Sequence, residues 1–447
     1  MSRGRFADLK TVVNIIGEQY FIDPRTGQVD GEEVPYWNVL MGVATYLGNK
    51  NALLVGRPGT GKTTYGGVIS SVVSGLPFDL FDFLKIQGHP DQTKDAMLAR
   101  ADIGRLAEEG VVWQPSLYLP AMILDEINRL PPGKQSIIME YIRTGSVEQL
   151  GKHFSRGKVP FFATMNYNGP GTYPLPPASV DRFGMSLEFE GGPAHLQALI
   201  QDASGRIQAD LADPNLTEEI AKYLLDKDVP TGKKREYLEE KGRERLKKLI
   251  LPDLSGLETH PLPLSPDATT FLRCIWDEMN TTWRYGENRA VDPQDTTDHN
   301  KTFASAHVKE GISPRAWESI TFYASIVARY QGRDQVEIGD IQAVSPFCLA
   351  HRLEFDEDYK AQFAEHPRLR GEREELDLTR RLLDAIKTNC DAVAPSLKLL
   401  DASLAGKKGT EEDVRAILDG PEPDHPLLRA YWREGRMLRK QGEASRR

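Results

Sequence analysis

A glycine-rich run carries the residue types that bind polyphosphate. Gly56, Gly61, Lys62 and Thr63 fit the pattern G-x-x-x-x-G-K-[ST], directly after a short apolar stretch, residues 51–55. In such a loop, backbone N–H groups and a helix N-terminus surround the phosphates, the lysine reaches the β and γ oxygens, and the hydroxyl takes Mg²⁺. The pattern therefore predicts a strand, a loop and a helix that bind ATP and Mg²⁺ as cofactors.

The candidate nucleotide ligands form one continuous segment. Glycine is needed where the loop takes positive φ and the backbone approaches the phosphate closely, and proline stiffens the turn between glycines. The alternative is a chance glycine turn before a helix, which the matching strand, loop and helix context disfavours. The expected ATP-binding residues are Gly56, Arg57, Pro58, Gly59, Thr60, Gly61, Lys62, Thr63 and Thr64.

Two adjacent carboxylates end the next strongly apolar segment, AMILDE, at residues 121–126. A fully buried strand of a parallel sheet has this composition. At the carboxyl end of such a strand, Asp125 would hold Mg²⁺ through water, and Glu126 would orient or deprotonate the water that attacks the γ-phosphate. By itself the segment could be a strand that simply reaches solvent, but its place after Lys62 favours the catalytic interpretation.

A third polar group follows the apolar stretch at residues 159–164. Asn166 would stand at the same sheet edge as Asp125 and Glu126. A neutral amide can bond both a water molecule and a phosphate oxygen, which suits a sensor of the γ-phosphate. The alternative, an asparagine that merely ends a strand, would be preferred without these neighbours.

Several further elements are expected around these groups. Spacing of apolar residues predicts a helix over residues 39–47 and continuation of the loop helix over 65–73. Residues 78–86 could form a second strand, and residues 91–109 have the composition of an insertion of short helices. Residues 146–158 look like a hairpin, with its turn at 151–153, Gly-Lys-His.

Helix signals return in the last third of the sequence. Ser313 and Pro314 are a helix start, so Arg315 falls in the first turn of that helix. The helix dipole disfavours a cation there, which makes an anion such as an ATP phosphate a sensible partner. We interpret the charged stretch 233–250 as a solvated helix face, with an extended element for a partner as the alternative. We interpret the basic end of the chain, 429–447, as a frayed tail, with a contact to nucleic acid or an acidic partner as the alternative.

Composition limits the class of protein. The chain has 447 residues, enough for two or three domains, with 40% hydrophobic and 27% charged residues, as in soluble globular proteins. We expect no membrane partner, because apolar runs are too short to span a bilayer. Three widely separated cysteines and the lack of a signal-peptide pattern favour a cytoplasmic protein. A net charge of −9 argues against a general nucleic-acid coat.

Four stretches together resemble the MoxR family of AAA+ ATPases, in the clade with an insert in the helix that follows the second strand. They are GRPGTGKTT, ILDEINRLPPGKQSIIMEYIRTGSV, PFFATMNYNGPGTYPLPPASVDRF and GISPRAWESI. The resemblance covers residues 35–190 and 310–355. It implies an α/β fold, an AAA+ core with a parallel five-stranded sheet flanked by helices, plus a helical lid and a helical C-terminal extension.

The resemblance also implies a division of the chain and two further site residues. We expect the α/β core over 1–195, an extended linker or insertion over 196–260, a lid with sensor 2 over 261–355, and the extension over 356–447. Arg182 stands where an arginine finger would reach a neighbour's ATP, and Arg315 stands at sensor 2. A guanidinium suits both places because it stays charged and bonds phosphate oxygens bidentately. Arg129 is a second candidate for the subunit contact, and a surface ion pair is the alternative for Arg182 and Arg129.

The family implies an ATPase that forms ADP and phosphate within a homo-oligomeric ring, expected to be a hexamer. Its work would be to remodel, chaperone or insert a cofactor or metal into a client protein, together with a von Willebrand factor A (VWA) domain protein. The main alternative is a nucleic-acid-directed motor of a restriction or mobile-element system. A nucleotide-gated scaffold without turnover and a small-molecule kinase explain fewer of the motif residues.

Overall fold

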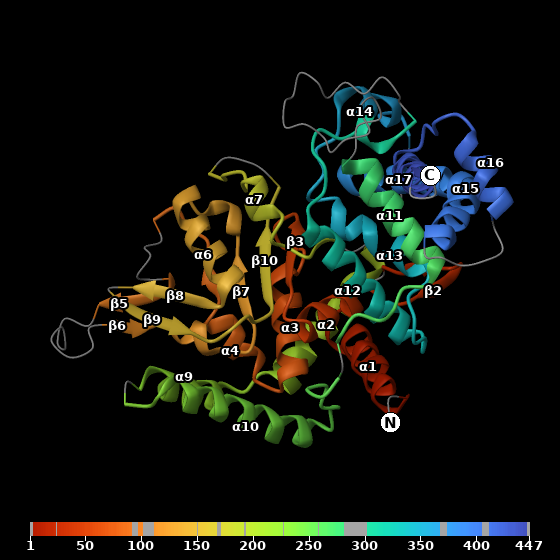
Figure 1. The fold of residues 1–447 in the computed structure, drawn as a ribbon. Coiled ribbons are helices and arrows are strands. Elements are labelled where there is room, and N and C mark those ends of the chain that lie inside the picture. The colour runs from red at the N-terminus through yellow and green to blue at the C-terminus, as the bar shows by residue number, and fades with distance from the viewer. Residues whose placement is uncertain are drawn as a thin grey trace. The chain divides into compact units, whose positions relative to one another are not determined.

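The computed structural model describes residues 3–23, 25–91, 97–101, 111–149, 151–167, 171–191, 194–226, 228–257, 259–280, 302–366, 373–404 and 411–444. The chain divides into two compact units (Figure 1). The first contains Met1–Pro261 and Ser325–Arg333, and the second contains Leu262–Ala324 and Asp334–Arg447.

A five-stranded parallel sheet forms the centre of the first unit, in the order β11-β3-β10-β7-β4. Its three middle strands are almost wholly apolar, because helices cover both faces of a parallel sheet and leave no solvated side. This confirms the predicted α/β sheet flanked by helices. The strands are β3 (Asn51–Gly56), β4 (Ile86–Gln87), β7 (Met122–Asp125), β10 (Phe161–Met165) and β11 (Met185–Phe189).

The register of the sheet brings the strand ends to one edge. Phe161 pairs with Asn51 and with Met122, so β10 runs level with both of its neighbours. Helix α3 (Lys62–Ser74) packs against β3, β7 and β10, and α2 (Trp37–Leu47) packs against β3. Helix α6 (Pro132–Thr144) contributes Ile138 and Ile142 to the same apolar core as the strands. The carboxyl ends of β3, β7 and β10 therefore meet at a single edge.

The prediction of a strand over residues 78–86 is wrong for most of that stretch. Helix α4 (Phe78–Phe83) occupies it, and only Ile86–Gln87 joins the sheet as β4. Pro77 stands immediately before the helix, where its missing N–H costs nothing, and Leu80 and Phe81 are buried by the helical turn. Apolar residues that are partly consecutive fit a short buried helix as well as a strand.

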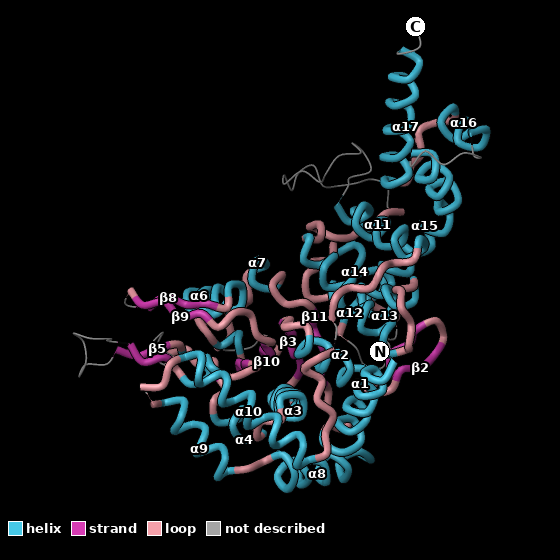
Figure 2. Tube along the Cα trace, turned by 60° about the horizontal axis from the view of Figure 1, so that its bottom comes forward, coloured by secondary structure: helices cyan, strands magenta, loops and turns pink. Residues whose placement is uncertain are grey.

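Two antiparallel strand pairs outside the central sheet lie side by side (Figures 1 and 2). One pair is β5 (Ala99–Ala101) with β6 (Val111–Trp113), and the other is β8 (Ser146–Gln149) with β9 (Lys152–Ser155). The rings of Trp113 and Phe154 join them, with centroids 5.3 Å apart.

These pairs alter two of the sequence predictions. Of the expected insertion of short helices, the structure describes residue 91 and residues 97–101: Met97 is helical, whereas 99–101 form a strand. Residues 92–96 and 102–110 lie outside the described residues. The predicted hairpin over 146–158 is present, but its turn falls between Gln149 and Lys152. Gly151, with φ 73°, supplies the left-handed conformation there, so Lys152 and His153 belong to the strand.

The segment preceding the sheet is helical at first. It forms α1 (Arg3–Ile15), which continues into one π-helical turn, Ile16–Tyr20, and then the short antiparallel pair β1 (Gly27–Val29) and β2 (Glu32–Val34). Helix α1 packs against α2, so this segment belongs to the first unit.

Residues 196–260 form helices that pack with the sheet's own helices. They are α8 (Gln197–Arg206), its π-helical continuation Ile207–Leu211, α9 (Pro214–Leu225) and α10 (Thr231–Leu249). Helix α10 contacts α3 and α9. An added Cβ at Gly242 would lie 2.2 Å from the carbonyl oxygen of Ser74, so α10 approaches the end of α3 too closely for any side chain there.

Two buried cations fix α10 to its neighbours. Lys234 donates to the carbonyl of Leu224 at 2.7 Å and lies over the ring of Tyr118. Arg245 donates to the carbonyls of Leu211 at 2.7 Å and Asp210 at 3.0 Å. These carbonyls lie at the ends of helices, where no N–H group of the same helix reaches them.

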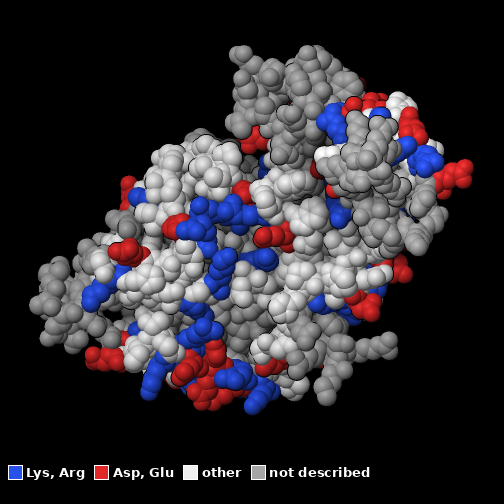
Figure 3. Space-filling view, viewed as in Figure 1, with Lys and Arg blue, Asp and Glu red and all other residues white. Residues whose placement is uncertain are grey.

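The outer face of α9 and α10 displays mixed acidic and basic side chains (Figure 3). The predicted solvated face is therefore one side of a docked helix.

The second unit is helical. The long helix α15 (Glu374–Leu404) packs against α11 (Pro266–Asn280), α13 (Ile338–Leu349) and α17 (Pro426–Ala444). Its other helices are α12 (Pro314–Tyr330), whose last part belongs to the first unit, α14 (Glu357–Phe363) and α16 (Glu411–Asp419). None of the helices in the described ranges combines the length and apolar character that a membrane span requires.

The prediction of a frayed basic tail is wrong for most of residues 429–447. Helix α17 runs to Ala444 and buries Leu428 and Trp432. Arg429 is also buried, and it donates to the carbonyl of Pro423 at 2.9 Å. The apolar residues at helical spacing bind this end to α15 and α16, which the excess of basic side chains obscured in the sequence.

Replacing Arg245 by alanine should loosen α10 from the first unit. The change leaves three carbonyl groups, those of Gly75, Asp210 and Leu211, without their donor. We expect the free energy of unfolding to fall by about 1.5 to 3 kcal/mol, the usual value of hydrogen bonds from a charged donor. Urea denaturation followed by circular dichroism would measure it.

Arg243→Ala is the matched control, because this exposed side chain bonds within its own helix, to the carbonyl of Glu239. It should change the free energy of unfolding by less than about 0.5 kcal/mol. Equal effects of the two substitutions would contradict the docking role of Arg245.

Candidate active site

The loop between β3 and α3 has the conformation that its glycines predict. Gly59 and Gly61 have φ of 78° and 82°, in the left-handed region, and a Cβ added at Gly59 would meet nothing within 4 Å. Gly56 serves another purpose, because a Cβ there would lie 2.0 Å from the carbonyl oxygen of Phe189 on β11. The first glycine therefore allows two strands to approach, and the later ones shape an open loop for a ligand.

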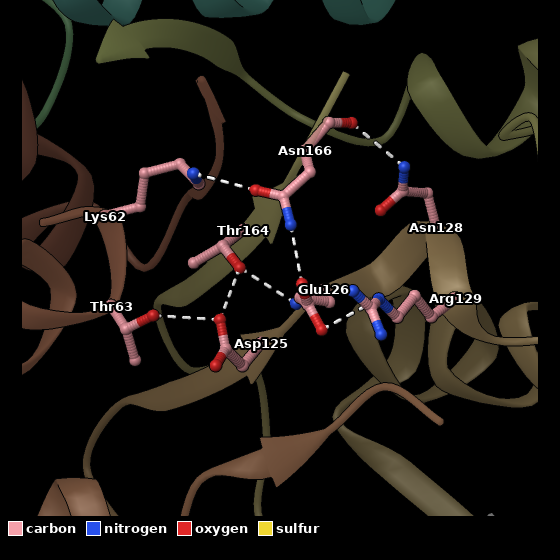
Figure 4. A network of polar contacts seen from close by, with 8 residues as sticks. All are labelled: Lys62, Thr63, Asp125, Glu126, Asn128, Arg129, Thr164 and Asn166. Carbon is pink, nitrogen blue, oxygen red and sulfur yellow. Dashed lines mark hydrogen bonds and ion pairs between the residues drawn. The ribbon is translucent and has the colours of Figure 1, made fainter. Parts of the chain in front are cut away.

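Lys62 begins α3 and points back across the loop (Figure 4). Its Nζ donates to the carbonyls of Gly56 at 2.9 Å and Arg57 at 2.7 Å, and to Oδ1 of Asn166 at 3.0 Å. Burial lowers the pKa of Lys62, while the carboxylates of Asp125 and Glu126 oppose that shift. The loop thus holds a cation at the place where phosphate oxygens would lie.

Thr63 and Asp125 form the oxygen-rich part of the site. The Thr63 hydroxyl donates to Oδ1 of Asp125 at 2.8 Å. A hydroxyl and one carboxylate are the protein ligands that suit Mg²⁺ when a nucleotide's phosphates and water supply the rest. The described residues contain no cluster of three or more His, Cys, Asp or Glu side chains able to hold a metal alone. The donor set therefore fits Mg²⁺ bound together with a nucleotide.

Glu126 is the most constrained carboxylate of the site. It follows β7 in the left-handed conformation, φ 55° and ψ 55°, which is costly for a residue with a Cβ. Its carboxylate accepts from Nδ2 of Asn166 at 2.5 Å and pairs with Nε of Arg129 at 2.9 Å. Both oxygens are thereby oriented before any ligand binds.

Asn166 joins the two charged groups of the site. Its Oδ1 accepts from Lys62 and its Nδ2 donates to Glu126, an assignment that follows because lysine can only donate and a carboxylate can only accept. Its backbone carbonyl accepts from Nδ2 of the fully buried Asn128 at 3.0 Å. Asn166 stands just past the end of β10, at the sheet edge where it was expected.

Thr164 belongs to this network, and sequence reasoning missed it. Its buried hydroxyl donates to Oδ1 of Asp125 at 2.6 Å and accepts from the backbone N–H of Glu126 at 2.8 Å. The register pairs Ala163 with Leu124, which sets Thr164 beside Asp125. The available signal was a lone hydroxyl in the apolar strand just before Asn166.

Arg182 lies at the other end of the sheet from the loop. It follows the short helix α7 (Pro177–Val180), and its carbonyl accepts from Nδ2 of Asn51 at 3.0 Å, at the start of β3. The loop follows the other end of β3, and six residues of strand span roughly 17 Å. Nε of Arg182 is buried without a hydrogen bond in the described part of the chain. This arginine is thus placed away from its own chain's Lys62.

The remaining predicted residues fall in four places. Arg57, Pro58 and Thr60 lie in the loop, where the Thr60 hydroxyl donates to the carbonyl of Arg57 at 2.8 Å, and Thr64 lies in the first turn of α3. Arg129 contacts Glu126 of its own chain. Arg315 is the second residue of α12, in the second unit, and its part in nucleotide binding stays a prediction.

Comparison with known proteins finds ATPases that match this chain in sequence and fold. Residues 51–185 match the family described as "ATPase family associated with various cellular activities (AAA)", and residues 300–375 match an AAA lid domain. The crystal structure of a candidate ATPase from Cytophaga hutchinsonii has the same fold, with a TM-score of 0.52 and 19% identity. The matched region covers 87% of this chain and 95% of the Cytophaga chain.

Curated relatives narrow the class. The uncharacterized protein YeaC of Bacillus subtilis is 25% identical over 70% of this chain and 80% of its own length. Protein MoxR of Methylorubrum extorquens is 23% identical over 70% of this chain and 82% of its own. The chloroplastic magnesium-chelatase subunit ChlI of Oryza sativa is 25% identical over 59% of this chain and 52% of its own.

The parallel sheet, the phosphate-binding loop at its edge and the adjacent carboxylates define an ATPase of the AAA+ class. The match to an AAA lid domain and the relatives YeaC and MoxR indicate one family within this class. Together these findings support a MoxR-family AAA+ ATPase.

Thr164→Val should slow ATP hydrolysis while leaving ATP binding within about threefold. Valine keeps the shape but removes both hydrogen bonds of the hydroxyl and leaves the Glu126 N–H unsatisfied, a loss of about 1 to 3 kcal/mol, or roughly a 5- to 150-fold lower rate. Phosphate release at saturating ATP and equilibrium binding of a labelled nucleotide would measure the two effects.

Thr164→Ser should restore most of the rate, because it returns the hydroxyl. Thr45→Val is a matched control, since this buried hydroxyl on α2 donates to Met41 within its own helix. A Thr164→Val protein that hydrolyses ATP at the parental rate would exclude the bridging role.

Proposed function

We propose that this protein hydrolyses ATP to ADP and phosphate at the carboxyl edge of its sheet. The observation that carries the proposal is the chain of contacts from Lys62 through Asn166 to Glu126. It connects the cation expected to bind the β and γ phosphates with the carboxylate expected to act on water. Hydrolysis removes the γ-phosphate, so these contacts would lose a phosphate oxygen that they bind in the ATP state.

Each residue has a separate task in this proposal. Lys62 leaves the loop carbonyls to bind phosphate oxygens, and the N–H groups at the start of α3 surround the same anion. Asn166 bonds the γ-phosphate or the attacking water, and Glu126 orients that water and takes its proton. Thr164 and Arg129 keep Glu126 in place as positioning residues.

Thr63 and Asp125 would hold Mg²⁺, which supplies charge neutralisation for the transferring phosphoryl group when it is bound with ATP. The buried hydroxyl of Thr164 directs the carboxylate of Asp125 by a hydrogen bond to Oδ1. This contact leaves the second oxygen, Oδ2, available for a water molecule of the metal.

Glu126→Gln should lower the hydrolysis rate by about 10² to 10⁴ and leave ATP affinity nearly unchanged, because an amide can still bond water but cannot take its proton. Lys62→Ala should instead weaken ATP binding, since it removes a direct phosphate contact. Steady-state phosphate release and equilibrium nucleotide binding separate the two results.

The control is Glu148→Gln, which removes one charge from an exposed position on β8. It should leave both the rate and the affinity unchanged. Parental turnover by Glu126→Gln would reject Glu126 as the group that activates water.

The place of Arg182 supports a site completed by a second subunit. This arginine stands at the opposite end of β3 from its own loop, so we infer that it acts on the nucleotide of an adjacent copy. A finger of this kind contributes about 10³ to 10⁵ in turnover by stabilising charge in the transition state. We therefore infer a closed homo-oligomeric ring, with six subunits as the expected number.

Mixing Arg182→Ala with Lys62→Ala should recover ATPase activity from two inactive proteins. Mixed assemblies would contain interfaces at which an intact Lys62 site faces an intact Arg182, which neither protein provides alone. Titrating one variant into the other and measuring phosphate release tests this. No recovery, while labelled subunits are shown to exchange, would mean that Arg182 does not act between chains.

Arg315 would connect nucleotide state with the lid. It stands in the first turn of α12, where the helix dipole favours a nearby anion, and a γ-phosphate is such an anion. Its contact would be made with ATP and lost with ADP.

The work driven by hydrolysis is proposed to be the remodelling of a client protein, or insertion of a cofactor or metal into it, with a VWA-domain protein as partner. Similarity to a magnesium-chelatase subunit supports the metal-insertion form of this activity. We expect the assembly to act in the cytoplasm, without a membrane partner.

A further inference from the structure

A cavity of about 660 Å³ lies within the second unit, between α11, α12 and α17. Its size falls in the range of small-molecule pockets, which is roughly 300 to 1,000 Å³. None of its lining residues belongs to the nucleotide site. Its walls combine aromatic rings with charged side chains from all three helices.

Two tryptophans form adjoining walls of this cavity. The rings of Trp276 on α11 and Trp317 on α12 have centroids 6.1 Å apart and planes at 81°. Both side chains are only partly buried, although tryptophan is among the residues that gain most from burial. The faces of indole rings are electron-rich, and such faces attract an organic cation.

The charges around the cavity favour the same kind of ligand. Asp277, Glu318 and Glu434 contribute three negative charges and Arg273 contributes one positive charge, a net of −2 (1 − 3). Arg273 donates to the hydroxyl of Tyr431. Within the described residues, none of the three carboxylates makes a hydrogen bond or a salt bridge through its side chain. They are therefore available to a ligand.

Asp277 is the carboxylate most affected by its surroundings. Burial raises the pKa of Asp277 to about 6, and the nearby His425 and Arg273 act in the opposite direction. The other ionisable groups facing the cavity are Glu318 from α12 and Glu434 and Tyr431 from α17. Asp277 is ionised at neutral pH and becomes neutral as the pH falls through about 6, so a bound cation would favour its charged form.

We propose that this cavity binds a small organic cation, an alkylated ammonium group on an apolar body, with Trp276 and Trp317 around the cation and Asp277 providing its counter-charge. Phosphate, carboxylate and other anions are excluded by the net negative lining. A neutral ligand of the same shape would gain the apolar contacts but neither the attraction of the rings nor that of the carboxylates.

Choline and 3,3-dimethylbutanol form the decisive pair of probes, because the second replaces the ammonium nitrogen by carbon at nearly the same shape. Titration of the full chain, followed by tryptophan fluorescence and calorimetry, should show saturable binding of choline that is about fivefold or more tighter than that of the alcohol. Choline binding should weaken as the pH is lowered through about 6. Equal affinities for the two probes would overturn the proposal.

Substitutions distinguish the aromatic wall from general packing. Trp317→Leu keeps an apolar side chain but should abolish measurable choline binding, whereas Trp317→Phe keeps a ring and should retain part of it. Asp277→Asn should weaken choline binding about fivefold or more and remove its pH dependence. Asp413→Asn, which removes an exposed charge on α16 outside the cavity, should change neither.

Thermal unfolding of each variant confirms that the second unit remains folded. If Trp317→Leu unfolds, the comparison of Trp317→Phe with Asp277→Asn still tests the proposal. A peptide with one lysine, acetyl-Ala-Lys-Ala-amide, provides the last arm. Binding of this peptide without binding of choline would show a partner's side chain to be the occupant and would reject the small-molecule assignment.

Discussion

The amide of Asn166 is the contact on which the rest of the active site depends. It accepts from a buried lysine and donates to a glutamate, and only a neutral group with both functions can stand between these charges. The two charges come from Lys62 after β3 and Glu126 after β7. The amide can reach both because β10 lies between those strands in a parallel sheet. Strand order and register are therefore conditions of the chemistry.

Close backbone packing maintains this arrangement. A Cβ at Gly56 would collide with β11, and one at Gly88 would lie 2.1 Å from the carbonyl of Glu126. The N–H of Gly88 also donates to the carbonyl of Asp125 at 2.7 Å. The left-handed conformation of Glu126 is thus held by the neighbouring segment at Gly88 and by the Thr164 hydroxyl. Its backbone strain is compensated by contacts from two strands.

Local sequence patterns were enough to predict much of the fold and most of the residues of the site. The loop around Lys62 and the pair at Asp125 could be identified because each is continuous in sequence. Thr164 escaped notice because its role depends on strand register, which no local pattern encodes. Apolar content alone could not separate a strand from helix α4, and charge alone concealed the buried side of α10, where Arg245 binds helix-end carbonyls.

Strand β3 separates the finger candidate from the loop within one chain, since Arg182 is tied to Asn51 at its start and Gly56 ends it. If Arg182 completes a neighbour's site, a freshly synthesised or dissociated subunit is idle, and ATP is consumed only where copies have gathered. The cell would then need no separate inhibitor to prevent futile turnover by lone chains. Control of local abundance would be control of enzyme output, and a partner that gathers subunits would switch the motor on.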